Sequence, residues 1–196
     1  MSKGRKLTPE DILPMAEYVR RRKEERQRVL ALKRRRRVEV GPVATFYFEN
    51  RDTMWLQVQE MLYIEKGGPE QIPDELAAYN PLIPNGSELV ATVMFEIDDE
   101  IRRKNFLARL GGVENTIFIE FADETVVAAP EQDVDRTSAE GKASSVQFVH
   151  FPFTRGQIEK FRKAGTRAVL GFKHPSYAHM AVVPEEVRAA LAEDFD

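Results

Sequence analysis

The sequence predicts an α+β fold: an antiparallel or mixed sheet of about seven strands with helices on one face, and a long basic N-terminal helix. Three observations support this fold class. Segments rich in β-branched and aromatic residues recur along the chain. Several neighbouring segments of this kind are joined by short turns, which favours antiparallel pairing. The remaining strand-like segments are separated by stretches with a helical pattern, which are bounded by capping residues and glycines.

Two parts of opposite charge make up the 196 residues, a length that suits one domain with an appendage. We assign residues 1–37 to a basic helical arm and residues 38–196 to a single α+β domain. The arm holds 14 Lys and Arg against 5 Asp and Glu, a net charge of +9, whereas the domain carries −12. This asymmetry indicates an interaction surface. The alternative is that the arm lies on its own body.

The helix of the arm is expected to begin at Thr8, which can cap it, with Pro9 in its first turn. Residues 20–28 contain no apolar side chain. A helix with an entirely polar middle lacks an apolar face for packing there. We therefore expect this helix to project from the body or to bridge two parts of it.

The first half of the domain is expected to alternate between strands and helices. Residues 38–49 are rich in strand formers, with a break at Gly41 and Pro42. The helix that follows is apolar almost all round, so we expect it to be largely buried. Its start can be capped by Asn50 or Asp52, and it ends at Gly67 and Gly68; a short helix from Pro73, a strand over 87–97 and a helix capped by Asp98 or Asp99 follow.

The second half of the domain is expected to contain two hairpins. TIFIEFA and TVVAA, joined at Asp123 and Glu124, form the first hairpin, and RAVLGF and AHMAVV form the second. Between them, SVQFVHFPF is a strand and Thr154 begins a helix. A closing helix begins at Pro184.

Several classes of protein are excluded or disfavoured. The chain has no cysteine, which excludes disulfides, thiolate metal ligands and a cysteine nucleophile. No apolar run approaches the ~20 residues of a membrane span, and the N-terminus lacks the apolar core of a signal peptide. We therefore expect a cytoplasmic protein. A phosphate-binding glycine loop, a nucleophile elbow, HExxH and a calcium loop are all missing, so the sequence favours a protein that is not an enzyme.

Three histidines form one candidate site, for a divalent metal. His174 and His179 flank PSYA, and a four-residue turn would place them opposite each other across a hairpin. His150 lies on a strand that would complete the cluster if it neighbours this hairpin. Imidazole suits zinc, iron and copper, so a metal-binding protein or metal-dependent enzyme is one hypothesis. The alternative is a polar turn and a hydrogen-bonded core histidine.

A polar interruption of the buried helix forms a second candidate site. Gln57 and Glu60 are three residues apart and therefore share a face, and Arg51 is a possible partner for Glu60. A buried carboxylate must be paired or protonated. The site is either a polar pocket with Glu60 as a base or metal ligand, or a structural ion pair.

The arginines of the arm form a third candidate site, which we predict binds a protein partner with an acidic surface. Binding of nucleic acid is an alternative, but Tyr18 is the only aromatic residue of the arm, and the acidic body would repel phosphate. A projecting helix would also suit a homodimer. The predicted partner-binding residues are Arg20, Arg21, Arg22, Arg34, Arg35, Arg36 and Arg37.

Long strings of the sequence resemble an uncharacterised bacterial family labelled as a domain of unknown function. The resemblance runs from Lys6 to Phe195. It implies a place in redox or stress metabolism, because members are encoded beside rubrerythrin-like proteins and iron–sulfur proteins resembling heterodisulfide reductase subunits. The strings are RKLTPEDILP, LKRRRRVEVGP, FENRDTMWLQVQEMLYIEKGG, ELAAYNPLIPNG, SSVQFVHFPFT and VLGFKHPSYAHMAVVPEEVRAAL.

The functional expectation combines the charge asymmetry with this resemblance. Without cysteines the chain holds no cysteine-ligated cluster of its own, so it would assist a redox protein rather than carry electrons. We expect a non-enzymatic accessory protein that binds a redox partner, an iron–sulfur or rubrerythrin-like protein, through the arm.

Overall fold

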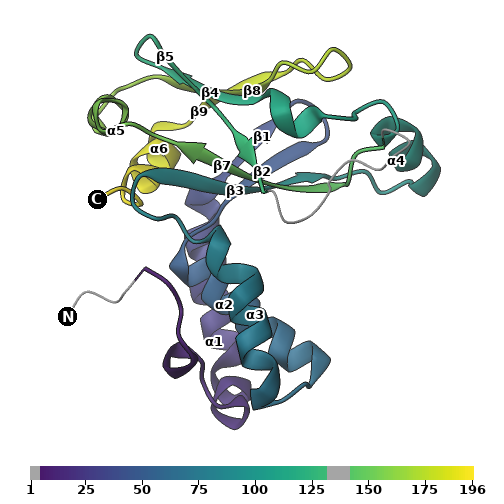
Figure 1. Ribbon diagram of the computed structural model, residues 1–196, viewed down its shortest axis with the longest axis vertical. Coiled ribbons are helices and arrows are strands. Elements are labelled where there is room, and N and C mark those ends of the chain that lie inside the picture. Colours follow the sequence, from purple (N-terminus) through teal and green to yellow (C-terminus); the bar gives the residue numbers. More distant parts are fainter. Residues whose placement is uncertain (1–4, 132–141) are drawn as a thin grey trace.

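The computed structural model describes residues 5–131 and 142–196, which form a two-sheet body and a helical stalk projecting from it (Figure 1). Residues 5–14 run along the stalk, and the C-terminus lies at the body near the base of the stalk (Figure 1). Among these residues, no helix combines the length and the apolar character needed to cross a membrane.

The body contains two sheets in which every pair of neighbouring strands is antiparallel. The five-stranded sheet has the order β1-β2-β3-β7-β6, and the four-stranded sheet has the order β5-β4-β8-β9. The strands are β1 (Arg37–Val40), β2 (Ala44–Phe48), β3 (Glu88–Phe95), β4 (Ile117–Phe121), β5 (Glu124–Val127), β6 (Ala129–Pro130), β7 (Val146–Pro152), β8 (Ala168–Phe172) and β9 (Met180–Val183).

The two sheets pack face to face through alternate residues of their strands. Leu89, Ala91 and Val93 of β3 are fully buried in a core that includes residues of both sheets. The rings of Phe46 on β2 and Phe172 on β8 lie 5.3 Å apart and join the sheets directly. Helices α5 (Arg155–Arg162) and α6 (Glu185–Ala192) close one end of the body, and α4 (Glu100–Leu107) lies at the other (Figure 1).

The stalk consists of α1 (Met15–Lys33), α2 (Arg51–Glu65) and α3 (Ile72–Tyr79). It has its own apolar cluster, in which Met54, Val58 and Leu62 of α2 are buried. Val90 of β3 belongs to this cluster, so the outer face of the five-stranded sheet anchors the stalk. The described residues also include short 3-10 turns: η1 (Pro9–Asp11), which precedes α1, and η2 (Arg34–Arg36), η3 (Pro69–Gln71), η4 (Asn80–Leu82) and η5 (Val113–Thr116), which lie between longer elements.

The α+β class is confirmed, but the predicted single sheet of about seven strands with helices on one face is wrong. The described residues form nine strands in two sheets. Alternation along a strand shows that one face is buried, but it does not show whether a helix or another sheet covers that face. Local features are as predicted: Asn50 caps α2 by accepting a hydrogen bond from Thr53 N at 3.0 Å, and both hairpins form.

The N-terminal helix differs from the prediction in its start and in its packing. It begins at Met15, because Pro14 occupies its N-cap, and Thr8 instead precedes the short turn η1. It packs along α2 with Tyr18 and Val29 fully buried. The polar middle is held by ion pairs rather than by apolar contacts. The helix projects from the body as part of the stalk (Figure 1), and it is packed there along α2 rather than exposed on all sides.

Candidate partner-binding groove

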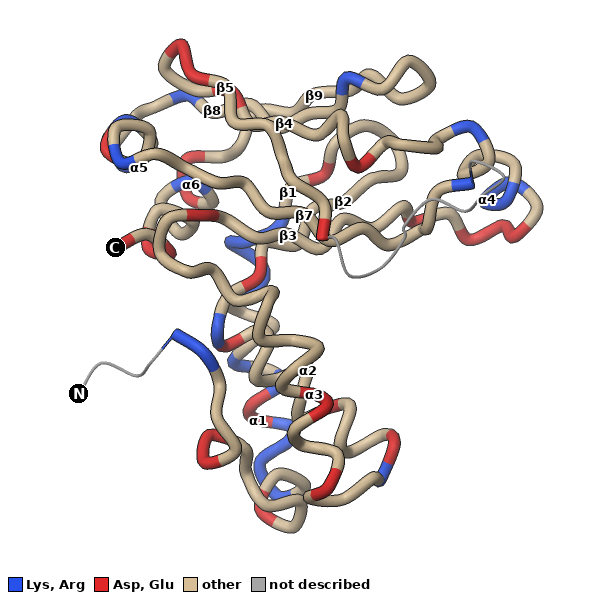
Figure 2. The backbone as a smooth tube through the Cα atoms, in the orientation of Figure 1, with Lys and Arg blue, Asp and Glu red and all other residues tan. Residues whose placement is uncertain are grey.

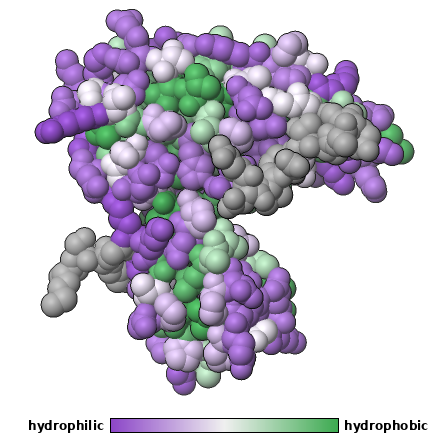
Figure 3. Space-filling model, in the orientation of Figure 1, coloured by the Kyte–Doolittle hydropathy of each residue, from purple (hydrophilic) through white to green (hydrophobic). Residues whose placement is uncertain are grey.

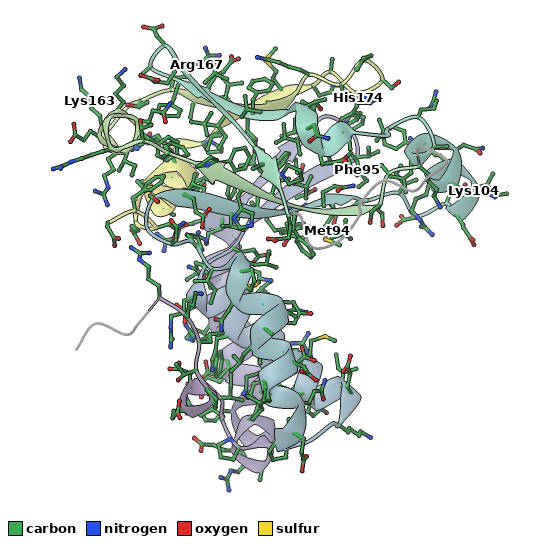
Figure 4. All side chains as sticks on the ribbon, viewed as in Figure 1. Met94, Phe95, Lys104, Lys163, Arg167 and His174 are labelled. Carbon is green, nitrogen blue, oxygen red and sulfur yellow. The ribbon has the colours of Figure 1, made fainter. Side chains whose placement is uncertain are left out.

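The three histidines do not come together. His150 lies on β7, where Glu88 and Glu131 flank its ring at 3.1 Å and 2.8 Å. His174 lies at the far end of the four-stranded sheet (Figure 4) and pairs with Tyr177 rather than with His179, because the hairpin turn is tighter than predicted. In residues 5–131 and 142–196, no three His, Asp or Glu side chains are arranged to hold a metal ion. The expected metal cluster is therefore not formed there.

The side chains of the predicted polar pocket on α2 also do not form one site; each contacts a different residue. Arg51 pairs with Asp11 at 2.5 Å rather than with Glu60. Gln57 Nε2 lies 3.4 Å from the hydroxyl of Tyr79. These side chains serve separate contacts within the stalk.

Glu60 is the centre of a polar cluster between α1 and α2. Arg22 donates to both of its oxygens, at 2.7 Å and 2.8 Å, and the Tyr18 hydroxyl donates at 2.5 Å. These bonds, Arg22 foremost, hold the pKa of Glu60 below its ordinary value, although burial acts in the opposite direction. Both oxygens of Glu60 already accept hydrogen bonds, and a lowered pKa makes the carboxylate a weaker base, so the geometry favours the structural ion pair.

Several predicted partner-binding arginines are already engaged within the protein. Arg21 pairs with Glu17 and Glu25, and Arg37 pairs with Glu39. Arg36 is 4% exposed, pairs with Asp194 and donates to the carbonyls of Phe48, Glu49 and Ala190. Arg36 is therefore a buried structural residue, which joins the base of the stalk to α6 and the C-terminus.

In the described part of the arm, the cations that form no ion pair lie mainly on α1 and η2. Figure 2 shows Lys and Arg along α1. Within the described ranges, three basic side chains of α1 (Arg20, Lys23 and Lys33) and two of η2 (Arg34 and Arg35) lie within 4.0 Å of no carboxylate. Arg20, Arg34 and Arg35 were predicted partner-binding residues, whereas Lys23 and Lys33 were not.

Lys23 and Lys33 line a surface groove of about 620 Å³ between α1 and α2. Arg22 and Arg26 also line it, and none of its lining residues in the described part of the chain is a carboxylate. Val19 and Leu30, 51% and 58% exposed, place two large apolar side chains between the cations. We call this part the basic half of the groove.

A second concavity, of about 580 Å³, continues from the first toward the tip of the stalk. Val19 and Tyr63 line both. The other described residues that line it are almost entirely apolar, and Lys66 is the one charged side chain among them. We call this concavity the apolar half. Hydrophobic residues reach the surface of the stalk in Figure 3. Besides the shared residues, its walls include Ile12, Pro14, Met15, Leu62, Pro69 and Ile72.

The groove can bind an anion and an apolar group together, because its lining consists of cations, hydrocarbon, one amide and one phenol. The sequence prediction missed its apolar half, which is assembled from three separate segments. A signal was present: Val19, Lys23, Arg26, Leu30 and Lys33 are spaced by three and four residues, which places apolar and basic side chains on one helix face.

Fold and groove together define an α+β protein with a two-sheet body and a grooved helical stalk. The chain belongs to the family described as protein of unknown function (DUF3501), whose model matches residues 6–195. This match confirms the resemblance to a family of unknown function. The chain is also similar to a protein of unknown function from Burkholderia pseudomallei, at 37% identity and a TM-score of 0.90, over 97% of this chain and 99% of that one. No curated protein gave a significant match.

Proposed function

We propose that this protein is a non-enzymatic docking protein, which binds an acidic surface of a protein partner through the groove between α1 and α2. One observation carries the proposal: Lys23 and Lys33 have no carboxylate partner among the described residues and line this groove beside exposed Val19 and Leu30. Cations that satisfy no internal ion pair are available to a partner, and their field favours a partner of opposite charge.

The narrower form of the proposal is that the partner is a redox protein of the iron–sulfur or rubrerythrin-like kind. Its support is the resemblance described above, which implies such neighbours for family members. The absence of cysteine agrees with an accessory role, since the chain would act on a cluster held by another protein.

Affinity capture from a nuclease-treated lysate of the source organism tests the proposal. The bait is the full chain, as wild type and as Lys23→Glu/Lys33→Glu. Reversal of Arg21 or Arg22 is a poorer choice, because it would break ion pairs inside the stalk. A matched control is Arg102→Glu/Lys104→Glu, which makes the same change in charge on α4, away from the stalk (Figure 4).

The wild type and the α4 control are expected to retain the same partner, the groove variant to lose it, and retention to fall as salt is raised. Equal capture by all three baits at low and high salt would contradict docking through the groove. A partner captured from an untreated lysate but not from the nuclease-treated one would point to nucleic acid instead.

A further inference from the structure

The two halves of the groove form one continuous surface with a defined order of chemistry: apolar at the tip of the stalk and basic toward the body. We propose that its occupant is an acidic amphipathic α-helix of the partner protein, with one bulky apolar side chain seated in the apolar half and carboxylates facing Lys23, Arg26 and Lys33. This inference rests on the proposed docking function and names the shape and chemistry of the docked segment.

The apolar half has the form of a pocket for an anchoring side chain. Its buried walls include Ile12 and Leu62, which are 8% and 4% exposed. Met15, 38% exposed, lies at its edge. Apolar side chains that fill such pockets supply most of the binding energy in many interfaces. Among the residues that the structure describes, no carboxylate lines this half, so an acidic partner meets no like charge from them.

The cations of the basic half are placed to pair with a row of carboxylates on the partner. Lys23, Arg26 and Lys33 are separated by three and seven residues and therefore share one face of α1. Arg22 is fixed by Glu60 and lies 4.2 Å above the ring of Tyr63, so it adds positive charge at the junction of the two halves. A partner helix with acids spaced by three or four residues presents a complementary row.

The length and the walls of the groove favour a helix over other ligands. Met15 and Lys33, both lining residues, are the first and last residues of α1, whose 19 residues extend roughly 28 Å. A single small molecule does not span this distance. Both main walls are helices, whose backbone groups are already bonded within the helix, so an extended peptide would find no strand edge to pair with. A docked helix satisfies its own backbone.

Binding of labelled synthetic peptides to the full chain, followed by fluorescence anisotropy, tests this inference. The probe is an acidic amphipathic peptide of about 18 residues, which matches the length of α1. It carries leucines in both terminal turns, so that either direction can seat an anchor. One comparison peptide has alanines in place of the leucines, and the other has lysines in place of the glutamates.

The acidic leucine peptide is expected to bind about tenfold more tightly than the alanine peptide, the usual effect of one anchor, and the lysine peptide is expected not to bind. Met15→Asp should weaken binding about tenfold by placing a charge in the apolar half. The variant should still fold, because an acidic residue is favourable in the first turn of a helix. Ile64→Asp is the control: Ile64 is 62% exposed on α2 and lines neither half.

Two outcomes would overturn the inference: no binding of the leucine peptide, or equal binding of the leucine and alanine peptides. Equal loss of affinity in Met15→Asp and Ile64→Asp would also contradict it. None of these results would contradict the proposed docking function, which is tested separately by lysate capture with the Lys23→Glu/Lys33→Glu variant. Loss of that capture dependence would remove both proposals.

Discussion

Arg22 of α1 and Glu60 of α2 form a two-pronged ion pair, with Nε 2.7 Å from Oε1 and Nη2 2.8 Å from Oε2. Tyr18 donates to the same carboxylate, so three polar groups hold the N-terminal helix against α2. Part of the positive charge of residues 1–37 is therefore neutralised by ion pairs inside the stalk. The charge available to a partner is smaller than the composition suggests and lies at particular positions.

The Tyr18 hydroxyl contributes to the stability of the stalk. Tyr18→Phe is expected to lower the free energy of unfolding by about 1.5–3 kcal/mol, because it removes a hydrogen bond to a charged, partly buried group while keeping the ring. Urea denaturation measures the change. Tyr63→Phe is the control, since the Tyr63 hydroxyl makes no hydrogen bond within the described part of the chain and its ring under Arg22 is kept. Equal effects of the two substitutions would show that the bond from Tyr18 to Glu60 contributes nothing.

Arg36 should be indispensable, whereas its neighbours Arg34 and Arg35 should not. Arg36→Ala leaves Asp194 and three carbonyls without their donor, and breaking a buried ion pair costs about 3–5 kcal/mol. Arg34→Ala and Arg35→Ala change exposed side chains and should stay within about 0.5 kcal/mol of the wild type. Urea denaturation of the three variants separates these cases, and similar midpoints for all three would contradict a structural role for Arg36.

The Tyr177 hydroxyl joins the two hairpin turns at one end of the body. It donates to Val40 O at 2.8 Å and accepts from Ala44 N at 3.1 Å and Val43 N at 3.3 Å. Tyr177→Phe is expected to cost about 1–3 kcal/mol, because it leaves buried backbone groups unsatisfied. The Ala44 amide should also exchange with solvent deuterium faster. Unchanged exchange at Ala44 would show that this contact does not restrain the β1–β2 turn.

His150 should make stability depend on pH. The hydrogen bond with Glu88, and then that with Glu131, raise the pKa of His150 above 6.5, although burial opposes the rise. A raised folded-state pKa means that the contribution is complete below the unfolded pKa, ~6.5, and is lost as pH rises through the folded value. The stability advantage of the wild type over His150→Gln should therefore shrink as pH increases from about 6.5.

Thermal unfolding of both proteins across this pH range measures the effect. The comparison with His179→Gln, which replaces an exposed imidazole, controls for loss of a histidine as such. An advantage that stays constant or grows with pH would contradict the assigned charge state of His150.

Local features of the fold could be predicted from the sequence because they depend on residues close together in the chain. The cap at Asn50, the turn at Asp123 and the cap at Thr154 each involve partners within a few residues. The pairing of His174 was missed because one turn residue more or fewer changes which side chains face each other.

The candidate site could be predicted only in outline. Composition placed the excess of positive charge in residues 1–37, which supply one wall of the groove and the cations of its basic half. Composition alone did not distinguish Lys23 and Lys33, which line the groove, from Arg36, which is buried.

The sequence by itself determined the α+β class, the hairpins, the helix caps and the basic character of the N-terminal segment, because periodicity, capping and composition act over short stretches of chain. Only the tertiary structure decided that two sheets face each other, that the three histidines do not form one cluster, and which arginines form ion pairs inside the protein. The physical reason is separation along the chain: Arg22 meets a carboxylate 38 residues away, and Arg36 meets one 158 residues away. Such partners become neighbours only when the whole chain has folded.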